Sequence, residues 1–169
     1  MWKVPVVVAM LISAAGSVSP WSMTPSQDSQ EVTTRFGSLT VDQDRSLLFR
    51  GRKLTPSVDG NNSLGLNNPI QIGDTDVVLV VDNGGTACPA MYYFVTVSKS
   101  GARATKPFGS CSDLTSVKQI GNSIRVTMPG YRGPHEPESV QLRAARQQHV
   151  FTFRAGVVTS RSPKGTRAR

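Results

Sequence analysis

The sequence predicts an all-β protein, a single small antiparallel β-sandwich or barrel with at most one short helix. Hydrophobic residues make up 38% of the 169 residues and charged residues 18%. This suffices for one core but is low in charge for a helical bundle. Glycine and proline are plentiful, with 15 and 11 copies. Turn signals recur about every ten residues between short β-favourable runs, as in sandwiches and small barrels.

The chain begins with a segment typical of a secretory signal peptide, which we place at residues 1–16. Lys3 supplies one positive charge, and about a dozen apolar or small residues follow it. A transmembrane helix needs roughly 20 apolar residues, and this run ends at Gly16. The sequence therefore predicts an exported protein that is periplasmic or extracellular.

The next segments predict a linker and a first hairpin. Residues 17–34 are polar and are interrupted by two prolines, so we interpret them as a disordered linker before a β-rich domain at 35–158. Phe36 to Val41 and Ser46 to Arg50 are short β-favourable runs that predict a hairpin. Residues 55–69 are rich in Pro, Gly and Asn and predict a loop.

The strongest strand signal runs from Asp76 to Asp82, where five consecutive aliphatic residues lie between two acids. Such a run predicts a strand buried on both faces. A second strand over Ala90 to Val97 follows. A tight turn centred on Lys99–Ser100 and a return strand over Ala102 to Lys106 complete this hairpin.

The C-terminal part predicts two more hairpins and one helix. Ser116 to Ile120 and Ser123 to Met128 flank a Gly-Asn turn. In the second run apolar and polar residues alternate, so one face is buried and the other is solvated. Glu138 to Gln148 predicts the helix. Val150 to Phe153 and Val157-Val158 predict a last hairpin.

The formal net charge of +8 is concentrated at the C-terminus. Residues 17–153 hold 13 Lys or Arg against 11 Asp or Glu, a net of +2, whereas residues 154–169 hold five basic residues and no acid. We interpret residues 159–169 as a basic disordered tail. This distribution disfavours a nucleic-acid partner. It leaves two interpretations of the tail, peripheral contact with anionic surfaces or no partner at all.

The two cysteines, Cys88 and Cys111, are predicted to form a disulfide, because an even count in an exported chain usually does. Their positions are symmetric about Lys99–Ser100, so a two-residue turn would place them directly opposite each other. A longer turn would shift that register, and Pro89 and Pro107 interrupt the ladder near the bridge. A reactive thiol or a metal ligand is the alternative, but a catalytic dithiol is usually Cys-x-x-Cys.

No motif for catalysis, for a cofactor or for a metal ion is complete, so no such residue is predicted. His135-Glu136-Pro137, for example, lacks the second histidine of a zinc-protease helix. One cluster of cations surrounds the first hairpin and is a candidate carboxylate- or phosphate-binding edge, with a solvated face as the alternative. Two of its members would share a strand face if the strand continued. The cluster consists of Arg45, Arg50, Arg52 and Lys53.

The segment from Ile72 to Asp113 contains Gly-Gly-Thr-Ala-Cys-Pro and, further on, Phe-Gly-Ser-Cys-Ser-Asp. It resembles a group of uncharacterised exported bacterial proteins that carry Gly-Gly-x-x-Cys-Pro and Phe-Gly-x-Cys-Ser-Asp in this order. The resemblance implies an envelope location and a disulfide between Cys88 and Cys111. It implies no activity and no catalytic residues.

These patterns together predict a secreted or periplasmic, non-enzymatic binding domain for an envelope protein or an anionic polymer, in an inhibitor- or immunity-like role. Its contacts are expected in the loops Pro56 to Asn68 and Pro129 to Pro137, because loops on a rigid sheet commonly carry binding. Two alternatives stay open. A cell-wall or polysaccharide hydrolase would need a cleft with two carboxylates about 5–9.5 Å apart. A structural envelope protein would be anchored by the basic tail.

Overall fold

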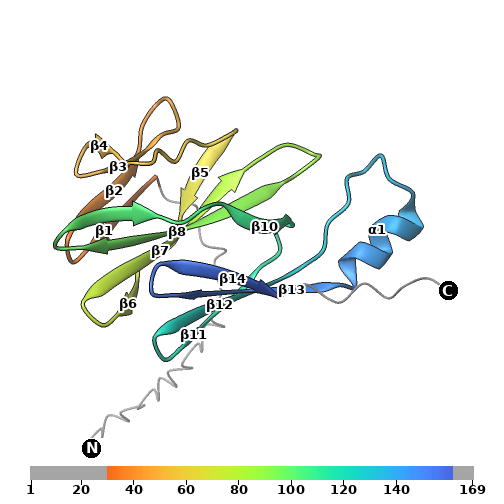
Figure 1. Cartoon of the computed structure of the whole chain (residues 1–169). Helices are drawn as coiled ribbons and strands as arrows, with labels where there is room; N and C mark the ends of the chain where they lie inside the picture. The colour runs from red at the N-terminus through yellow and green to blue at the C-terminus, as the bar shows by residue number, and fades with distance from the viewer. Residues whose placement is uncertain (1–29, 162–169) are drawn as a thin grey trace, which may run out of the picture.

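The computed structural model of the protein describes residues 30–161. This part of the chain contains fourteen strands and one helix (Figure 1). The strands form three sheets in which all neighbours are antiparallel. The predicted all-β class with one short helix is therefore confirmed. The predicted signal peptide at 1–16 and the last eight residues of the predicted tail lie outside the described residues.

The first sheet has the strand order β1-β2-β3-β4. Its strands are β1 (Glu31–Thr34), β2 (Gly37–Val41), β3 (Leu47–Phe49) and β4 (Arg52–Lys53). The first predicted hairpin is confirmed as β2 and β3, with Leu39 opposite Phe49. The predicted linker is wrong at its C-terminal end, because β1 lies in it. Val32 and Thr34 are buried and alternate with exposed residues, a short period-two pattern within polar sequence.

The second sheet has six strands, and two of them form its centre. The strands are β5 (Ser63–Leu66), β6 (Ile70–Ile72), β7 (Thr75–Asn83), β8 (Ala90–Ser98), β9 (Gly101–Ala104) and β10 (Phe108–Cys111). β5 and β6 pair with β7, while β9 and β10 pair with β8. The predicted loop at 55–69 is wrong at β5, where Leu64 and Leu66 are buried.

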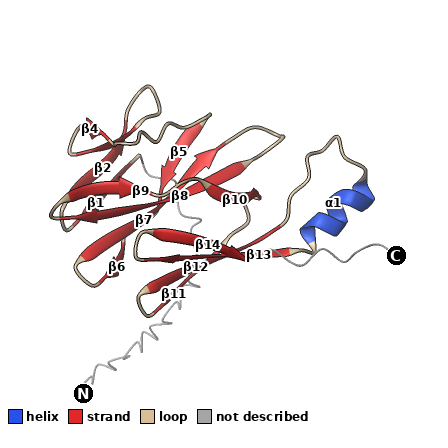
Figure 2. Ribbon diagram, in the orientation of Figure 1, coloured by secondary structure: helices blue, strands red, loops and turns tan. Residues whose placement is uncertain are grey.

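The third sheet has the order β11-β12-β13-β14, and α1 connects β12 to β13 (Figure 2). Its elements are β11 (Ser116–Ile120), β12 (Ser123–Pro129), α1 (Glu138–Ala145), β13 (Gln148–Arg154) and β14 (Val157–Arg161). Both predicted hairpins are confirmed. The helix is shorter than predicted because Gln148 already begins β13. The predicted tail is wrong over residues 159–161, which pair with Val150 to Thr152 but carry no hydrophobic signal.

The β7–β8 hairpin separates two hydrophobic clusters. Val78 and Val80 lie in a cluster with the first sheet and β5, whereas Val77 and Leu79 lie in a cluster with β10 and the third sheet. Side chains alternate along β8 in the same way, so Phe94 joins the second cluster. The expected burial of this strand on both faces is therefore confirmed, and the middle sheet is shared by both cores.

One ion pair joins the first sheet to the middle sheet. The Asp76 side chain is 2% exposed and accepts hydrogen bonds from the Arg35 backbone N–H at 2.7 Å and from Arg35 Nε at 2.8 Å. Arg35 Nη2 also donates to the carbonyl oxygens of Gly73 and Thr75. A buried carboxylate requires such partners because desolvation of its charge is costly.

Candidate functional site

Cys88 and Cys111 form the predicted disulfide. The turn between them has two residues as predicted, with Ser98 opposite Gly101. The cysteines are nevertheless not directly opposite, since the register shifts by one residue between β9 and β10 and by another within β10, so that Cys111 pairs with Ala90. A β-bulge of this kind inserts an unpaired residue and bends the strand. The bridge therefore forms beside the ladder, with a Cα–Cα distance of 4.6 Å.

The disulfide fastens the loop at 84–89 to β10, and this loop in turn holds the segment after β12. Gly84 N–H donates to the Pro89 carbonyl at 2.7 Å, and a Cβ at Gly84 would lie 2.1 Å from the Cys88 carbonyl oxygen. Only glycine fits this turn. The Tyr131 hydroxyl donates to the Thr86 carbonyl oxygen at 2.5 Å. The bridge, the loop and the segment around Tyr131 thus form one connected unit.

The four cations predicted as an anion-binding edge do not all come together. Arg50, Arg52 and Lys53 line one shallow hollow of about 580 Å³, and Arg45 is not part of it. The expected continuation of the strand past Arg50 is wrong. The chain turns at Arg50 and Gly51, which have φ angles of 50° and 75°, and β4 begins after them.

Within this hollow, two of the cations already interact with other groups of the protein. Arg50 Nε donates to the Phe36 carbonyl oxygen at 2.9 Å, and its guanidinium lies 5.0 Å from the Phe49 ring centroid. Lys53 interacts electrostatically with Asp59. Among the described residues, Arg52 makes no hydrogen bond or ion pair through its side chain. Arg50 and Lys53 therefore already interact with the first hairpin and its neighbourhood. Anion binding in this hollow stays a prediction.

Asp59 has a pKa below its ordinary value of 3.8, first because Ser46 Oγ donates to it at 2.6 Å and then because Ser57 Oγ donates at 2.8 Å. We expect Ser46→Ala to raise this pKa, measured by NMR titration of the carboxyl carbon. A depressed folded-state pKa adds stability above the unfolded pKa and loses it as pH falls through the folded value. The variant should therefore lose less stability on acidification. As a control, Lys53→Gln should change the pKa less, and a larger effect of that control contradicts this assignment.

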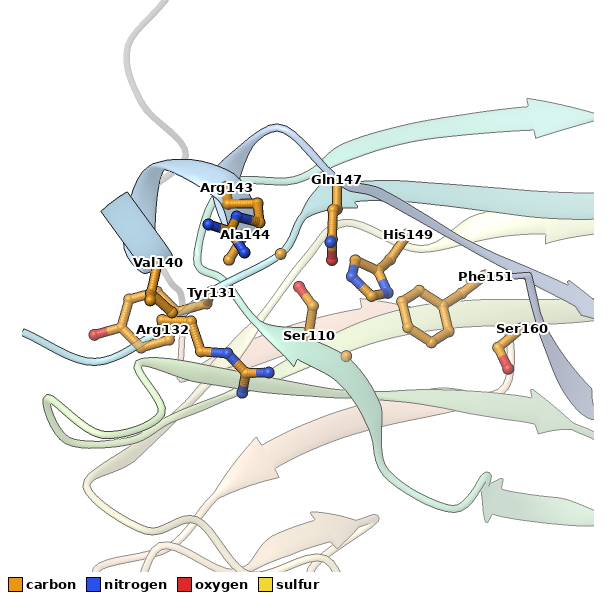
Figure 3. A pocket seen from close by; sticks show the side chains of 12 residues that line it. Ser110, Tyr131, Arg132, Val140, Arg143, Ala144, Gln147, His149, Phe151 and Ser160 are labelled. Atoms are coloured by element: carbon orange, nitrogen blue, oxygen red, sulfur yellow. The ribbon is translucent and has the colours of Figure 1, made fainter. Parts of the chain in front are cut away.

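The structure brings together a second set of cations, around a pocket of about 570 Å³ under α1 (Figure 3). Arg132 comes from the segment after β12 and Arg143 from α1, while His149 and Phe151 come from β13 and Ser110 from β10. Figure 3 shows these side chains arranged around one cavity. The set spans four elements of the chain, which explains why sequence spacing did not reveal it.

The position of α1 over this pocket depends on Gly130. A Cβ there would lie 2.7 Å from the Ala144 carbonyl oxygen and 3.2 Å from His149 Nε2. The Gly130 N–H also donates to the Gln147 carbonyl oxygen at 2.8 Å. The C-terminal end of the helix therefore packs directly on the end of β12. This contact fixes how close α1 lies to the strands that line the pocket.

A second hollow, of about 440 Å³, continues the pocket and shares Gly109, Phe151 and Ser160 with it. Lys106 lines this second part. We call the two hollows together the β10–β14 groove, after the strands beside it. Its chemistry-bearing residues are Lys106, Ser110, Arg132, Arg143, Phe151 and Ser160.

Within the described residues, both strands beside the groove have one edge without a partner strand, since β10 pairs only with β8 and β14 only with β13. On β10, the Ser110 N–H donates to Met128 Sδ at 3.3 Å. Every second residue of such an edge strand directs its N–H and C=O away from its own sheet. Within residues 30–161, the side chains of Lys106, Arg132 and Arg143 make no hydrogen bond or ion pair, and no Asp or Glu lines either hollow. The groove thus combines backbone groups, free cations and an aromatic side chain.

Five hollows on the described surface have no Asp or Glu among their lining residues. They therefore provide no carboxylate pair for the hydrolase alternative. In the described part of the chain, no helix is long and apolar enough to cross a membrane. Comparisons of the sequence and structure with family models, curated proteins and solved structures gave no match.

Proposed function

We propose that the protein is an exported, non-enzymatic binding domain that takes up an extended acidic segment of another envelope protein. The β10–β14 groove is the observation that supports this proposal most directly. It offers free cations beside two unpaired strand edges. The disulfide is consistent with an oxidising compartment outside the cytoplasm, and the N-terminal signal pattern points the same way.

An extended peptide in the groove would satisfy the unpaired edge of β10 or β14 by strand addition, in which main-chain hydrogen bonds provide affinity and side-chain contacts provide specificity. Acidic side chains of the peptide would pair with Arg132 and Arg143, since guanidinium groups bind carboxylates with two parallel hydrogen bonds. Phe151 would contact an apolar side chain between them. An inhibitor- or immunity-like role follows naturally, because the partner's segment would be covered while bound.

The test is fluorescence anisotropy with a labelled peptide of alternating glutamate and valine. The double variant Arg132→Glu/Arg143→Glu is expected to weaken binding by at least about tenfold, because each lost charge-assisted hydrogen bond contributes about 1.5–3 kcal/mol. Arg103→Glu/Arg146→Glu is the matched control. It changes the net charge by the same amount at two exposed residues that do not line the groove, so its affinity should stay close to that of the unmodified protein.

A second peptide, N-methylated at alternate backbone nitrogens, tests strand addition separately from charge. It keeps both carboxylates and valines but cannot donate to a strand edge, so we expect its affinity to fall as well. Equal losses for Arg103→Glu/Arg146→Glu and the groove variant would show that net charge alone attracts the peptide. Unchanged affinity of the N-methylated peptide would show that no strand is added. Either result would overturn this binding mode.

A further inference from the structure

We propose that the solvent-facing side of the third sheet is a second binding site, for a linear polyanion whose phosphate groups repeat along a chain without bases. The cations of this site differ from those of the β10–β14 groove, although Ser160 lines hollows of both, and the inference does not rest on the proposed function. We call it the outer face. Its cations are Lys118, Arg125, Arg154 and Arg161.

The strand register places these four cations on one side of the sheet. Lys118 is opposite Arg125, and Arg125 is opposite Thr152. Arg154 is opposite Ser123, two residues before Arg125, and therefore points to the same side. Arg161 is opposite Val150, which is two residues before Thr152. The residues between these positions face the second core and are buried, namely Ile124, Val126, Phe151 and Phe153.

The cations of the outer face are not used by the fold. All four are exposed, and within the described residues none of them makes a hydrogen bond or an ion pair through its side chain. The strand positions on this face include no Asp or Glu. Like charges directly opposite each other across two strands destabilise a sheet. The pairing of Lys118 with Arg125 therefore works against folding, and an anionic ligand would relieve it.

The spacing of the cations suits a flexible chain of phosphates. Neighbouring strands lie about 4.8 Å apart, and residues on one face of a strand repeat about every 6.7 Å, which puts Arg125 about 8 Å from Arg154 and about 12 Å from Arg161 at the backbone. Long arginine side chains can adjust these distances by several ångströms. Arg125 and Arg161 line a hollow of about 590 Å³ together with Thr127, Thr152 and Thr159, whereas Arg154 and Lys118 lie outside its lining. Threonine hydroxyls donate readily to phosphate oxygens.

The chemistry of the face favours a polymer without bases. Proteins that bind single-stranded nucleic acid stack bases on aromatic side chains. The outer-face positions of β11 to β14 carry no aromatic side chain, because every aromatic residue of β13 points into the core. A phosphodiester-linked polyol or sugar polymer would therefore pair with the four cations and the threonine hydroxyls of this face without needing aromatic contacts.

The experiment measures binding of the full-length protein to long-chain inorganic polyphosphate over a range of salt concentrations. Arg125→Gln/Arg154→Gln is expected to weaken binding on the order of tenfold and to reduce the slope of log affinity against log salt by about 0.7 for each cation removed. Lys99→Gln/Arg103→Gln is the matched control. It removes the same charge from exposed residues outside the third sheet and should change both quantities little.

Two further arms decide between occupants. A chain ending at Arg161 keeps β14 complete, and we expect it to retain part of the affinity, whereas complete loss would assign binding to residues 162–169 and overturn the proposal. Oligodeoxythymidylate with the same number of phosphates should bind less tightly than polyphosphate, and tighter binding would assign the face to nucleic acid instead. In the background of the groove variant Arg132→Glu/Arg143→Glu, the change Arg125→Gln/Arg154→Gln should still weaken polyphosphate binding strongly. The two proposed sites can therefore be tested independently of each other.

Discussion

Replacing Arg35 by alanine is expected to destabilise the protein by about 3 kcal/mol, at the lower end of the range for breaking a buried ion pair. The reason is the position of Asp76, whose side chain is 2% exposed and would be left buried without its arginine partner. Arg35 itself is 39% exposed, and its backbone N–H still donates to Asp76 in the variant. Both facts keep the expected loss of stability below the upper end of the range for breaking a buried ion pair.

Urea unfolding followed by circular dichroism measures this loss, and a double-mutant cycle isolates the pair. In an Asp76→Asn background the charge is already absent, so Arg35→Ala should cost much less, about 1 kcal/mol for the remaining hydrogen bonds. Arg103→Ala is the control for removing an exposed arginine and should stay within about 0.5 kcal/mol. The same cost for Arg35→Ala in both backgrounds would contradict the proposed role of the buried charge.

Removing the disulfide with Cys88→Ala/Cys111→Ala is expected to cost about 3 kcal/mol, because the bridge closes a loop across a sequence separation of 23 residues. A domain of this size has a total stability of about 5–15 kcal/mol, so the loss is large. Denaturant midpoints of the variant and of the unmodified protein measure it. Reduction of the unmodified protein with dithiothreitol should reproduce the shift.

The same variant should also weaken peptide binding in the groove. The bridge holds the loop at 84–89, this loop accepts the Tyr131 hydroxyl through Thr86, and Arg132 follows directly. Tyr131→Phe is the matched control, since it removes only that tether and should lower peptide affinity with a stability cost of about 1 kcal/mol. Full peptide affinity in a cysteine-free but folded protein would refute this connection.

The elements with a strong local signal could be predicted from the sequence. The aliphatic run between Asp76 and Asp82 and the alternation from Ser123 to Met128 are decided by burial, which composition reveals directly. β1, β5 and the end of β14 were missed for the opposite reason. They are short, polar or rich in turn-forming residues, and they become strands because a neighbouring strand supplies hydrogen-bond partners. Such tertiary pairing leaves little trace in a single sequence.

The candidate site shows the same division. The disulfide was predictable because two cysteines in a chain with a predicted export signal leave one pairing, although the bulge that shifts Cys111 was not. The cations around Arg50 were predicted from their proximity along the chain. In the structure, however, the Arg50 side chain donates a hydrogen bond to the Phe36 carbonyl oxygen. Arg132 and Arg143 are far from Lys106 in sequence, and only the packing of α1 on Gly130 brings them to one groove. Long-range contacts of this kind have no spacing rule.

Burial of β7 on both faces requires an apolar sequence, and this sequence has a consequence for the unfolded chain. Val77 to Val81 is an uncharged, strongly β-favourable segment without proline or glycine, the type that assembles into intermolecular sheets when exposed. Asp76 and Asp82 stand at its two ends as gatekeepers against such assembly. In the native state the first binds Arg35 and the second accepts the Asn61 N–H at 2.7 Å. The same two carboxylates thus oppose aggregation of the unfolded chain and form hydrogen bonds that stabilise the folded one.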